Sequence, residues 1–234
     1  MCQKHLKFSI IIPCYHDESK LAHLLSQLRQ LSPAAAEIIV IDAAHSEQCV
    51  EICNRYQAMH ITSEINRGRQ LLVGAEKAQG DVLWFLHADA QLTKGAFTAI
   101  TAAIVSGAAG GYFRFRFAAP FAWPAPLLEY AIALRCRLGG IPYGDQGIFM
   151  LRSIYQQCGG HAPWPLFEEV SLVRAARRIG KFLPLTEPIF VDSRRWQRDG
   201  WWHRTWKNRV LVLRFICGTS PAELAKQYRS KNRI

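Results

Sequence analysis

Three aspartates, Asp17, Asp42 and Asp89, each lie at or near the end of a short apolar run. Runs of this kind predict strands that are buried on both faces of a parallel sheet. Because α/β sheets bind ligands beyond the carboxyl ends of their strands, we expect these carboxylates to converge on one edge. There they could hold a divalent cation, and Mg²⁺ or Mn²⁺ suits carboxylate and phosphate oxygens. For Asp89 alone, the alternative is a helix N-cap after a core strand.

The glycine motifs of two common nucleotide-binding folds are missing. The first apolar run is followed by Pro13-Cys14-Tyr15-His16-Asp17 rather than by G-x-G-x-x-G, and no G-x-x-x-x-G-K-[ST] occurs. The predicted sheet therefore favours a nucleotide-sugar binder, in which acids contact the base and ribose and hold a cation on the diphosphate.

A basic segment, Asn66-Arg67-Gly68-Arg69-Gln70, opens a predicted helix. Guanidinium groups beside the free N–H groups of a helix N-terminus make a good diphosphate site. The alternative is a solvated basic helix start.

Two adjacent acids, Glu168 and Glu169, open another predicted helix after a Gly/Pro/Trp loop at residues 159–165. Acids at a helix start commonly complement the helix dipole and face solvent. A carboxylate beside such a loop is also suited to deprotonate an acceptor hydroxyl, provided that it lies within hydrogen-bond reach. The residues alone leave both interpretations open.

The order of the predicted elements determines how these side chains are positioned. Strand-like and helix-like segments alternate from residue 7 to about 105, which predicts an α/β fold with a mostly parallel central sheet and helices on both faces. We expect strands at 8–12, 38–41, 59–62 and within 81–89, and helices at 17–31, 47–56, 66–79 and 94–105. Beyond residue 108 we expect a half-exposed strand at 111–117, a Pro/Trp-rich link at 120–126, a helix up to Arg137, a strand at 148–151 and a helix at 167–179.

Composition limits the class of protein. The 234 residues, half of them apolar, can bury one full core, and the net charge of +11 favours an anionic partner. No signal peptide is visible in residues 1–7, and no apolar run approaches the roughly 20 residues of a membrane-spanning helix. Seven scattered cysteines without a C-x-x-C pair indicate free buried thiols, so we expect a cytoplasmic protein.

The tail mixes tryptophans, arginines and aliphatic residues at roughly helical spacing over residues 196–217. This pattern is typical of helices in a membrane interface, so contact with the inner face of a membrane through residues 197–217 is one expectation. The alternative is a C-terminal helix that packs its tryptophans against the domain. Nucleic acid is not expected, because the basic residues are spread along the chain and no RNA-binding motif is present.

Several motifs occur together in an order that resembles family 2 glycosyltransferases of the GT-A fold. They are Ile10-Ile11-Ile12-Pro13, Val40-Ile41-Asp42, Gly80-Asp81 leading to Phe85-Leu86-His87-Ala88-Asp89, Gly144-Asp145-Gln146, Phe167-Glu168-Glu169-Val170 and Arg194-Arg195-Trp196. More narrowly, the chain is similar to the small bacterial branch found beside radical-SAM proteins and assigned to arsenosugar biosynthesis. The resemblance covers about residues 8–230.

The resemblance implies an enzyme of the hexosyltransferase type. It would move a sugar from a nucleotide-diphospho-sugar, UDP-linked by expectation, to an acceptor hydroxyl with inversion, assisted by Mg²⁺ or Mn²⁺. It also implies a GT-A domain at residues 1–195, with residues 196–234 as a basic, Trp-rich helical extension of the same domain. The alternative function is a catalytically weak GT-A-like protein that serves as a membrane-surface or partner-binding module.

The resemblance also assigns roles to single residues. Glu169 would be the catalytic base with Glu168 supporting it, and Asp89 would bind the metal. Contacts to the nucleotide-sugar would come from Pro13, Asp17, Asp42, Arg67, Arg69 and His87. Contacts to the acceptor and diphosphate would come from Gly144, Asp145, Gln146, Arg195 and Trp196.

The chain departs from the family pattern at four places. The family's Thr-x-Asn-Glu is Cys14-Tyr15-His16-Asp17, and its Gly-Gly-Ser loop is Ala43-Ala44-His45, where alanine resists the positive φ that glycine permits. His87-Ala88-Asp89 keeps one acid of the D-x-D element, and Glu169 replaces an aspartate. We expect altered donor preference or reduced activity from these changes.

Overall fold

The computed structural model describes residues 6–32, 34–119 and 123–230. The expectations for residues 1–5, 120–122 and 231–234 therefore lie outside the described residues. In chain order the elements are β1 (Phe8–Cys14), α1 (Glu18–Gln30), β2 (Glu37–Asp42), α2 (Glu47–Arg55), β3 (Met59–Thr62), α3 (Arg67–Lys77), β4 (Val82–Phe85), α4 (Ala96–Val105), β5 (Gly110–Phe117), α5 (Pro124–Arg137), the 3-10 turn η1 (Gly144–Gln146), β6 (Phe149–Leu151), α6 (Arg152–Gln157), α7 (Glu169–Ile179), β7 (Phe182–Val191), α8 (Arg194–Asp199), α9 (Trp201–Ile216) and α10 (Pro221–Ser230).

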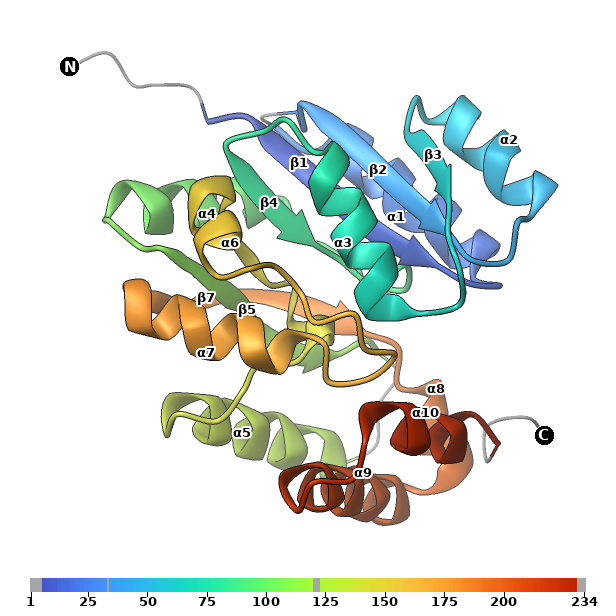
Figure 1. Cartoon of the computed structure of the whole chain (residues 1–234), viewed down its shortest axis with the longest axis vertical. Coiled ribbons are helices and arrows are strands. Elements are labelled where there is room, and N and C mark those ends of the chain that lie inside the picture. Colours follow the sequence, from blue (N-terminus) through green and yellow to red (C-terminus); the bar gives the residue numbers. More distant parts are fainter. Residues whose placement is uncertain (1–5, 33, 120–122, 231–234) are drawn as a thin grey trace.

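Within the described residues, seven strands form one sheet in the order β3-β2-β1-β4-β6-β5-β7 (Figure 1). Strand β6 runs antiparallel to its neighbours β4 and β5, whereas the remaining pairs are parallel. The expected mostly parallel sheet with helices on both faces is confirmed.

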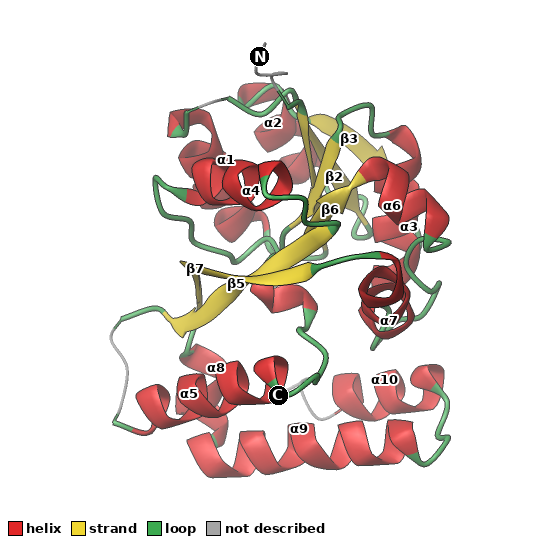
Figure 2. Cartoon of the chain, turned by 90° about the vertical axis from the view of Figure 1, so that its left-hand side faces the viewer, coloured by secondary structure: helices red, strands yellow, loops and turns green. Residues whose placement is uncertain are grey.

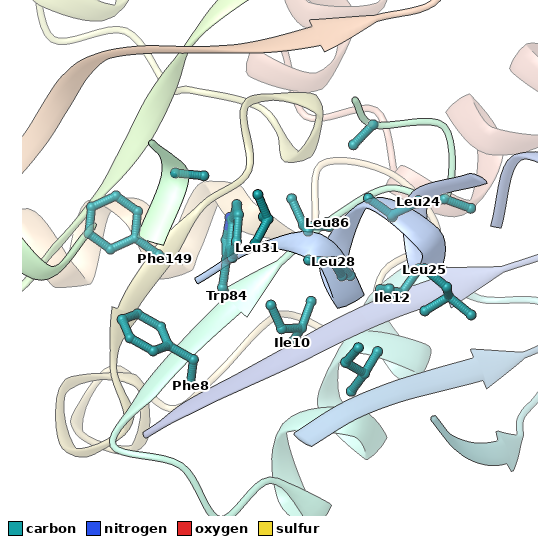
Figure 3. Packing of buried hydrophobic residues seen from close by; sticks show 14 of the residues in the cluster. Phe8, Ile10, Ile12, Leu24, Leu25, Leu28, Leu31, Trp84, Leu86 and Phe149 are labelled. Atoms are coloured by element: carbon teal, nitrogen blue, oxygen red, sulfur yellow. The ribbon is translucent and has the colours of Figure 1, made fainter. Parts of the chain in front are cut away.

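Two cores cover the two faces of the sheet because successive strand residues point in opposite directions. On one face, Ile10 and Ile12 of β1 pack with Leu24, Leu25 and Leu28 of α1 (Figure 3). Helices α2 and α4 add to the same core. On the other face, Ile11 packs with residues of α3, α6 and α7. Both faces are therefore apolar, which explains the continuous hydrophobic runs of the strands.

Strand β1 continues through Pro13 to Cys14, so the expected end of this strand at residue 12 is wrong. Beyond Ile11 the strand pairs only with β2, because its ladder with β4 ends at the pair Ile11 and Phe85. Proline lacks an N–H group, and it is tolerated where one side of a strand has no partner. The longer strand carries Cys14 level with Asp42.

The second half departs further from the expected pattern. Strand β5 is not half-exposed, because only Arg114 in it is exposed while β6 and β7 pair along its two edges. Strand β7 was not expected, since it contains Pro184 and Pro188, and it is accommodated at the edge of the sheet. Helix α6 was not expected either.

The C-terminal helices pack beside α5 and α7, at the end of the molecule away from β3 (Figures 1 and 2). Trp196 and Trp201 contact the Phe117 ring, each at a centroid distance of 5.0 Å. Leu224 of α10 is fully buried against Phe167 and Val170 near the start of α7. No helix in the described part of the chain is long and apolar enough to cross a membrane.

The described cysteines are all free thiols. Four of them, Cys14, Cys49, Cys53 and Cys136, are buried as expected. Cys217 differs, because it follows α9 and is exposed.

Candidate active site

The carboxyl ends of β1, β2 and β4 lie at one edge of the sheet, where α3 and α7 also begin (Figure 1). Asp89 lies in the turn after β4, and α4 starts only at Ala96 with Gly95 as its N-cap. The alternative role of Asp89 as a helix cap is therefore wrong. The charged groups that act on one another at this edge are Arg67, His87, Asp89, Asp145, Glu168, Glu169 and Arg195.

Glu168 is paired with the arginine that opens α3. Arg67 donates from Nε to one Glu168 oxygen and from an Nη atom to the other, the second bond measuring 3.3 Å. Glu168 is 1% exposed, and its burial would raise its pKa, but the Arg67 guanidinium holds the pKa below its ordinary value. The pair fixes the loop before α7 to the first turn of α3.

Glu169 is buried without such a partner. It is 2% exposed, and its Oε2 atom has no hydrogen-bond partner among the described residues. Burial and then the negative charge of Glu168 raise the pKa of Glu169 to about 8. This carboxyl group can therefore gain and lose a proton near neutral pH, as a general base must.

His87, which follows β4, lies against the turn η1. His87 Nε2 is buried and has no partner in the described structure, and burial followed by the Arg67 charge lowers the pKa of His87 to about 4. A Cβ atom on Gly144 would lie 2.7 Å from this nitrogen, so glycine permits the close approach. Burial raises the pKa of Asp145 to about 6. Gln146 points into the interior, where its amide donates to the Phe113 carbonyl at 3.3 Å.

A cavity of about 340 Å³ lies next to these groups, and Asp89 lines it. The other lining residues are Lys20, Asp192, Arg194, Arg195 and Arg198. Four cationic and two acidic side chains therefore surround this space. Such a set suits a diphosphate that carries a divalent cation, because carboxylate oxygens bind the ion and guanidinium groups bind phosphate. Arg195 and Asp89, expected from the sequence, lie together here.

The family model for Glycosyl transferase family 2 matches residues 9–159, which is more than half of the chain. The chain belongs to glycosyl transferase family 2. No curated protein matches the sequence.

Two solved structures of glycosyltransferases are similar to this family 2 chain. Glucosyl-3-phosphoglycerate synthase from Mycobacterium tuberculosis, solved with Mn²⁺, UDP and glucosyl-3-phosphoglycerate, superposes with a TM-score of 0.59 at 14% identity, covering 80% of this chain and 71% of the synthase. A mannosyltransferase from Pyrobaculum calidifontis, solved with GDP-Man and Mn²⁺, gives a TM-score of 0.65 at 14% identity, covering 94% of this chain and 67% of that one. The shared fold is GT-A, as expected.

Asp42 of this family 2 chain shapes the loop that follows β2. Its Oδ1 accepts from the Ala44 N–H and its Oδ2 from the Ser46 N–H, both at 2.8 Å. The positive φ of 54° falls on His45 rather than on either alanine, so the departure from the family's glycines is accommodated at that residue. Asp42 itself is fully buried.

The remaining expected residues lie in different surroundings. Asp17 pairs with Lys20 at 2.9 Å, and Arg69 is 58% exposed and pairs with Glu64 at 3.2 Å. Pro13 lies level with Ile41 in the sheet. Trp196 packs on Phe117 beneath the Arg204 guanidinium, which lies 5.3 Å from the ring centre, and it does not line the cavity.

Sequence reasoning missed several residues of this site. Lys20 follows Asp17 by one helical turn, and that spacing could have indicated it. Asp192 follows β7, a strand that was not expected, so no signal placed it. Gly68 donates its N–H to the Trp164 carbonyl at 3.0 Å and brings α3 against the loop that leads to Glu168.

Proposed function

We propose that this protein transfers a sugar from a nucleotide-diphospho-sugar to an acceptor hydroxyl, with Glu169 as the general base. The observation that carries this proposal is the buried Glu169 carboxyl, which has an unpartnered oxygen and a raised pKa at the edge that also holds Asp89 and Arg67. Perturbed carboxyl groups of this kind cluster at catalytic sites. Glu169 reaches one methylene further than the family's aspartate.

Proposed roles for the other groups follow from charge. Asp89 would hold Mg²⁺ or Mn²⁺, since it lines the cavity with Asp192 and both offer carboxylate oxygens. When bound, the ion neutralises negative charge on the diphosphate. Arg195 and Lys20 face the same space and would stabilise the leaving group. Glu169 would remove the acceptor proton during in-line attack on the anomeric carbon, which inverts its configuration.

The donor and the narrower assignment are proposals as well. We propose a UDP-linked hexose, supported by the synthase solved with UDP, although the mannosyltransferase holds GDP-Man. Membership in the radical-SAM-associated, arsenosugar branch rests on the sequence resemblance. The division into a GT-A domain at 1–195 and an extension at 196–234 also rests on the sequence resemblance. The boundary between the two falls inside α8.

We also propose that the enzyme works on the cytoplasmic face of a membrane. On α9, Trp202, Trp206, Leu213 and Ile216 are between 54% and 68% exposed and lie on one side of the helix. On α5, a second exposed stripe consists of Trp123, Leu127, Tyr130, Leu134 and Leu138. The two stripes meet where the rings of Trp123 and Trp202 lie 6.3 Å apart. The alternative for the tail, a helix that packs its tryptophans against the domain, holds for Trp196 and Trp201, which pack inward.

Calorimetric titration of UDP and GDP, with Mn²⁺ and with EDTA, tests the proposed catalytic function. We expect metal-dependent binding of one nucleotide, loss of that binding in Asp89→Ala, and its retention in Glu169→Gln. With the matching sugar donor and water as acceptor, Glu169→Gln should lower nucleotide release about 10²–10⁴-fold. Glu51→Gln, an exposed glutamate on α2, is the matched control.

Full turnover by Glu169→Gln would show that the base assignment is wrong. If neither nucleotide binds, the catalytically weak membrane-surface or partner-binding module becomes the better description. The observation that favours this second function is that His87 stands where the family's D-x-D element has its first acid.

A further inference from the structure

Asp42, Cys49 and His60 bring three different kinds of ligand atom together, away from the cavity that Asp89 lines. A carboxylate oxygen, a thiol sulfur and an imidazole nitrogen all lie within 4.8 Å of one another. Asp42 ends β2, Cys49 lies in the first turn of α2, and His60 lies in β3. Three consecutive elements therefore place these atoms at one point.

The spacing of two of these atoms fits a shared ion as well as it fits a long hydrogen bond. His60 Nε2 lies 3.4 Å from Asp42 Oδ2. A good N–H···O bond is about 2.7–3.2 Å long. In a tetrahedral zinc site with metal–ligand distances of about 2.0–2.3 Å, two ligand atoms lie roughly 3.3–3.8 Å apart.

The surroundings hold the ligands in place. The Ala44 and Ser46 N–H groups donate to the two Asp42 oxygens, which fixes the carboxylate. Ser46 Oγ accepts from the Cys49 N–H at 3.3 Å and anchors the first turn of α2. Hydrogen bonds of this kind orient metal ligands in known sites. The His60 side chain is 16% exposed and the Asp42 side chain is fully buried, so an ion can enter from the His60 side.

The donor set identifies the class of ion. Thiol and imidazole ligands favour zinc-like ions, whereas Mg²⁺ and Mn²⁺ prefer oxygen. Two further buried thiols, Cys14 and Cys53, interact with the Cys49 thiol, which adds soft character around the cluster. This cluster is thus chemically distinct from the carboxylate ligands, Asp89 and Asp192, that we propose for the diphosphate cation.

We propose that Asp42, Cys49 and His60 bind one thiophilic divalent cation of the zinc class, with a fourth position left for water. The ion would engage the Asp42 carboxylate, to which the family resemblance assigns a contact with the nucleotide-sugar. Zinc should therefore oppose nucleotide binding, a consequence that rests on the proposed function, whereas the metal site itself does not.

Cobalt(II) is the probe for the site, because its absorption reports ligand type and geometry. Metal-free protein should take up one equivalent of Co²⁺. The complex should show a thiolate-to-cobalt charge-transfer band and tetrahedral ligand-field bands, and one equivalent of Zn²⁺ should remove both. Cys49→Ser should abolish the charge-transfer band, and His60→Gln should lower the affinity for Zn²⁺ at least tenfold. Cys158→Ser and Cys217→Ser are matched controls that should change nothing. A Cys2→Ser background excludes binding by the N-terminal Cys2 and His5.

The outcomes separate the site from the proposed function. If Co²⁺ gives no thiolate band, or if Cys49→Ser and His60→Gln both bind like the parent, the site is wrong. His60→Gln carries the test should Cys49→Ser fail to fold, since His60 lies partly at the surface. In excess Mg²⁺, one equivalent of Zn²⁺ should weaken UDP or GDP binding at least tenfold in the parent but not in His60→Gln. Equal nucleotide affinity with and without Zn²⁺ overturns the competition alone, whereas absence of all nucleotide binding overturns the proposed function and leaves the cobalt result standing.

Discussion

Glu168 and Glu169 are neighbours in the chain, yet their pKa values move in opposite directions. Both are buried, so burial raises the pKa of each. Only Glu168 has a cation against it, and the Arg67 guanidinium brings the pKa of Glu168 below its ordinary value. Its negative charge then acts on Glu169. One ion pair therefore divides two like residues into a fixed anion and a group that exchanges protons.

The rate of donor hydrolysis should depend on pH through this pair. Because the pKa of Glu169 is raised to about 8, its basic form is scarce below that pH, and the rate should rise with pH up to about 8. Glu168→Gln removes the neighbouring negative charge and frees Arg67, and both changes lower the pKa of Glu169. The rising limb should therefore shift to lower pH in this variant. A pH–rate profile that is flat between pH 6 and 9, or a limb that Glu168→Gln leaves in place, would contradict the assignment.

At the scale of elements, the start of α3 is held against the loop before α7. A Cβ atom on Gly68 would lie 2.1 Å from the Ala162 carbonyl oxygen and 2.6 Å from that of Trp164. These are backbone atoms, which cannot turn aside as a side chain can. The Ala162 N–H in turn donates to the Glu168 carbonyl at 3.1 Å, so the contact continues to the two acids for which we propose catalytic roles.

Gly68→Ala should therefore destabilise the protein and impair its site together. We expect a loss of about 1–3 kcal/mol in the free energy of unfolding, the usual cost of forcing extra volume into a packed region. Urea denaturation measures this loss, and donor hydrolysis by the folded variant should fall because Arg67 moves away from Glu168. Gly107→Ala is the control. No heavy atom lies within 4 Å of a Cβ atom added at Gly107, and φ there is +87°, so this variant tests backbone strain without crowding. Wild-type hydrolysis in folded Gly68→Ala would show that the contact does not position the acids.

The elements that the sequence predicted well are those with a plain local signal. Strands β1, β2 and β4 are apolar runs and α1 carries leucines at helical spacing, so most of the first half of the fold follows from local pattern. Strand β7 was missed because its two prolines are tolerated only at a sheet edge, and an edge is a property of the assembled sheet. Strand β5 was placed too far toward solvent because its two arginines suggested an exposed face.

The candidate site shows the same division between local and long-range information. Glu169 and Asp89 were named from their motifs; Asp89 follows β4 at the expected edge of the sheet, and Glu169 lies at the start of α7. The pairing of Arg67 with Glu168 joins residues 101 positions apart, and nothing in either motif indicates it. Gln146, named from its motif, proves to be turned toward the Phe113 carbonyl because the left-handed Gly147 ends the turn η1 there.

At the scale of the whole molecule, charge and apolar exposure coincide at one end. The exposed stripes of α5 and α9 lie together there, and Lys207, Arg209 and Arg214 are interspersed along α9 (Figure 2). Tryptophans with basic residues are suited to the headgroup region of an anionic bilayer. A symmetric second copy on this face would bring like charges together in a protein of net charge +11, so a lipid surface is the better match.

Sedimentation with vesicles tests this surface in the intact chain. Removing residues 197–234 is a poor test, because α9 and α10 bury Phe167 beside Glu168 and Glu169. Trp202→Glu and Trp206→Glu instead change side chains that are 54% and 65% exposed.

We expect the parent to sediment with phosphatidylserine vesicles but not with neutral ones. Salt should release it, because each basic residue near an anionic surface contributes about 1 kcal/mol that salt screens. Each tryptophan variant should lose most of this binding. Val105→Glu, which places the same charge on an exposed apolar residue of α4, should retain it. Equal sedimentation of all four proteins would show that the face of α5 and α9 does not contact lipid.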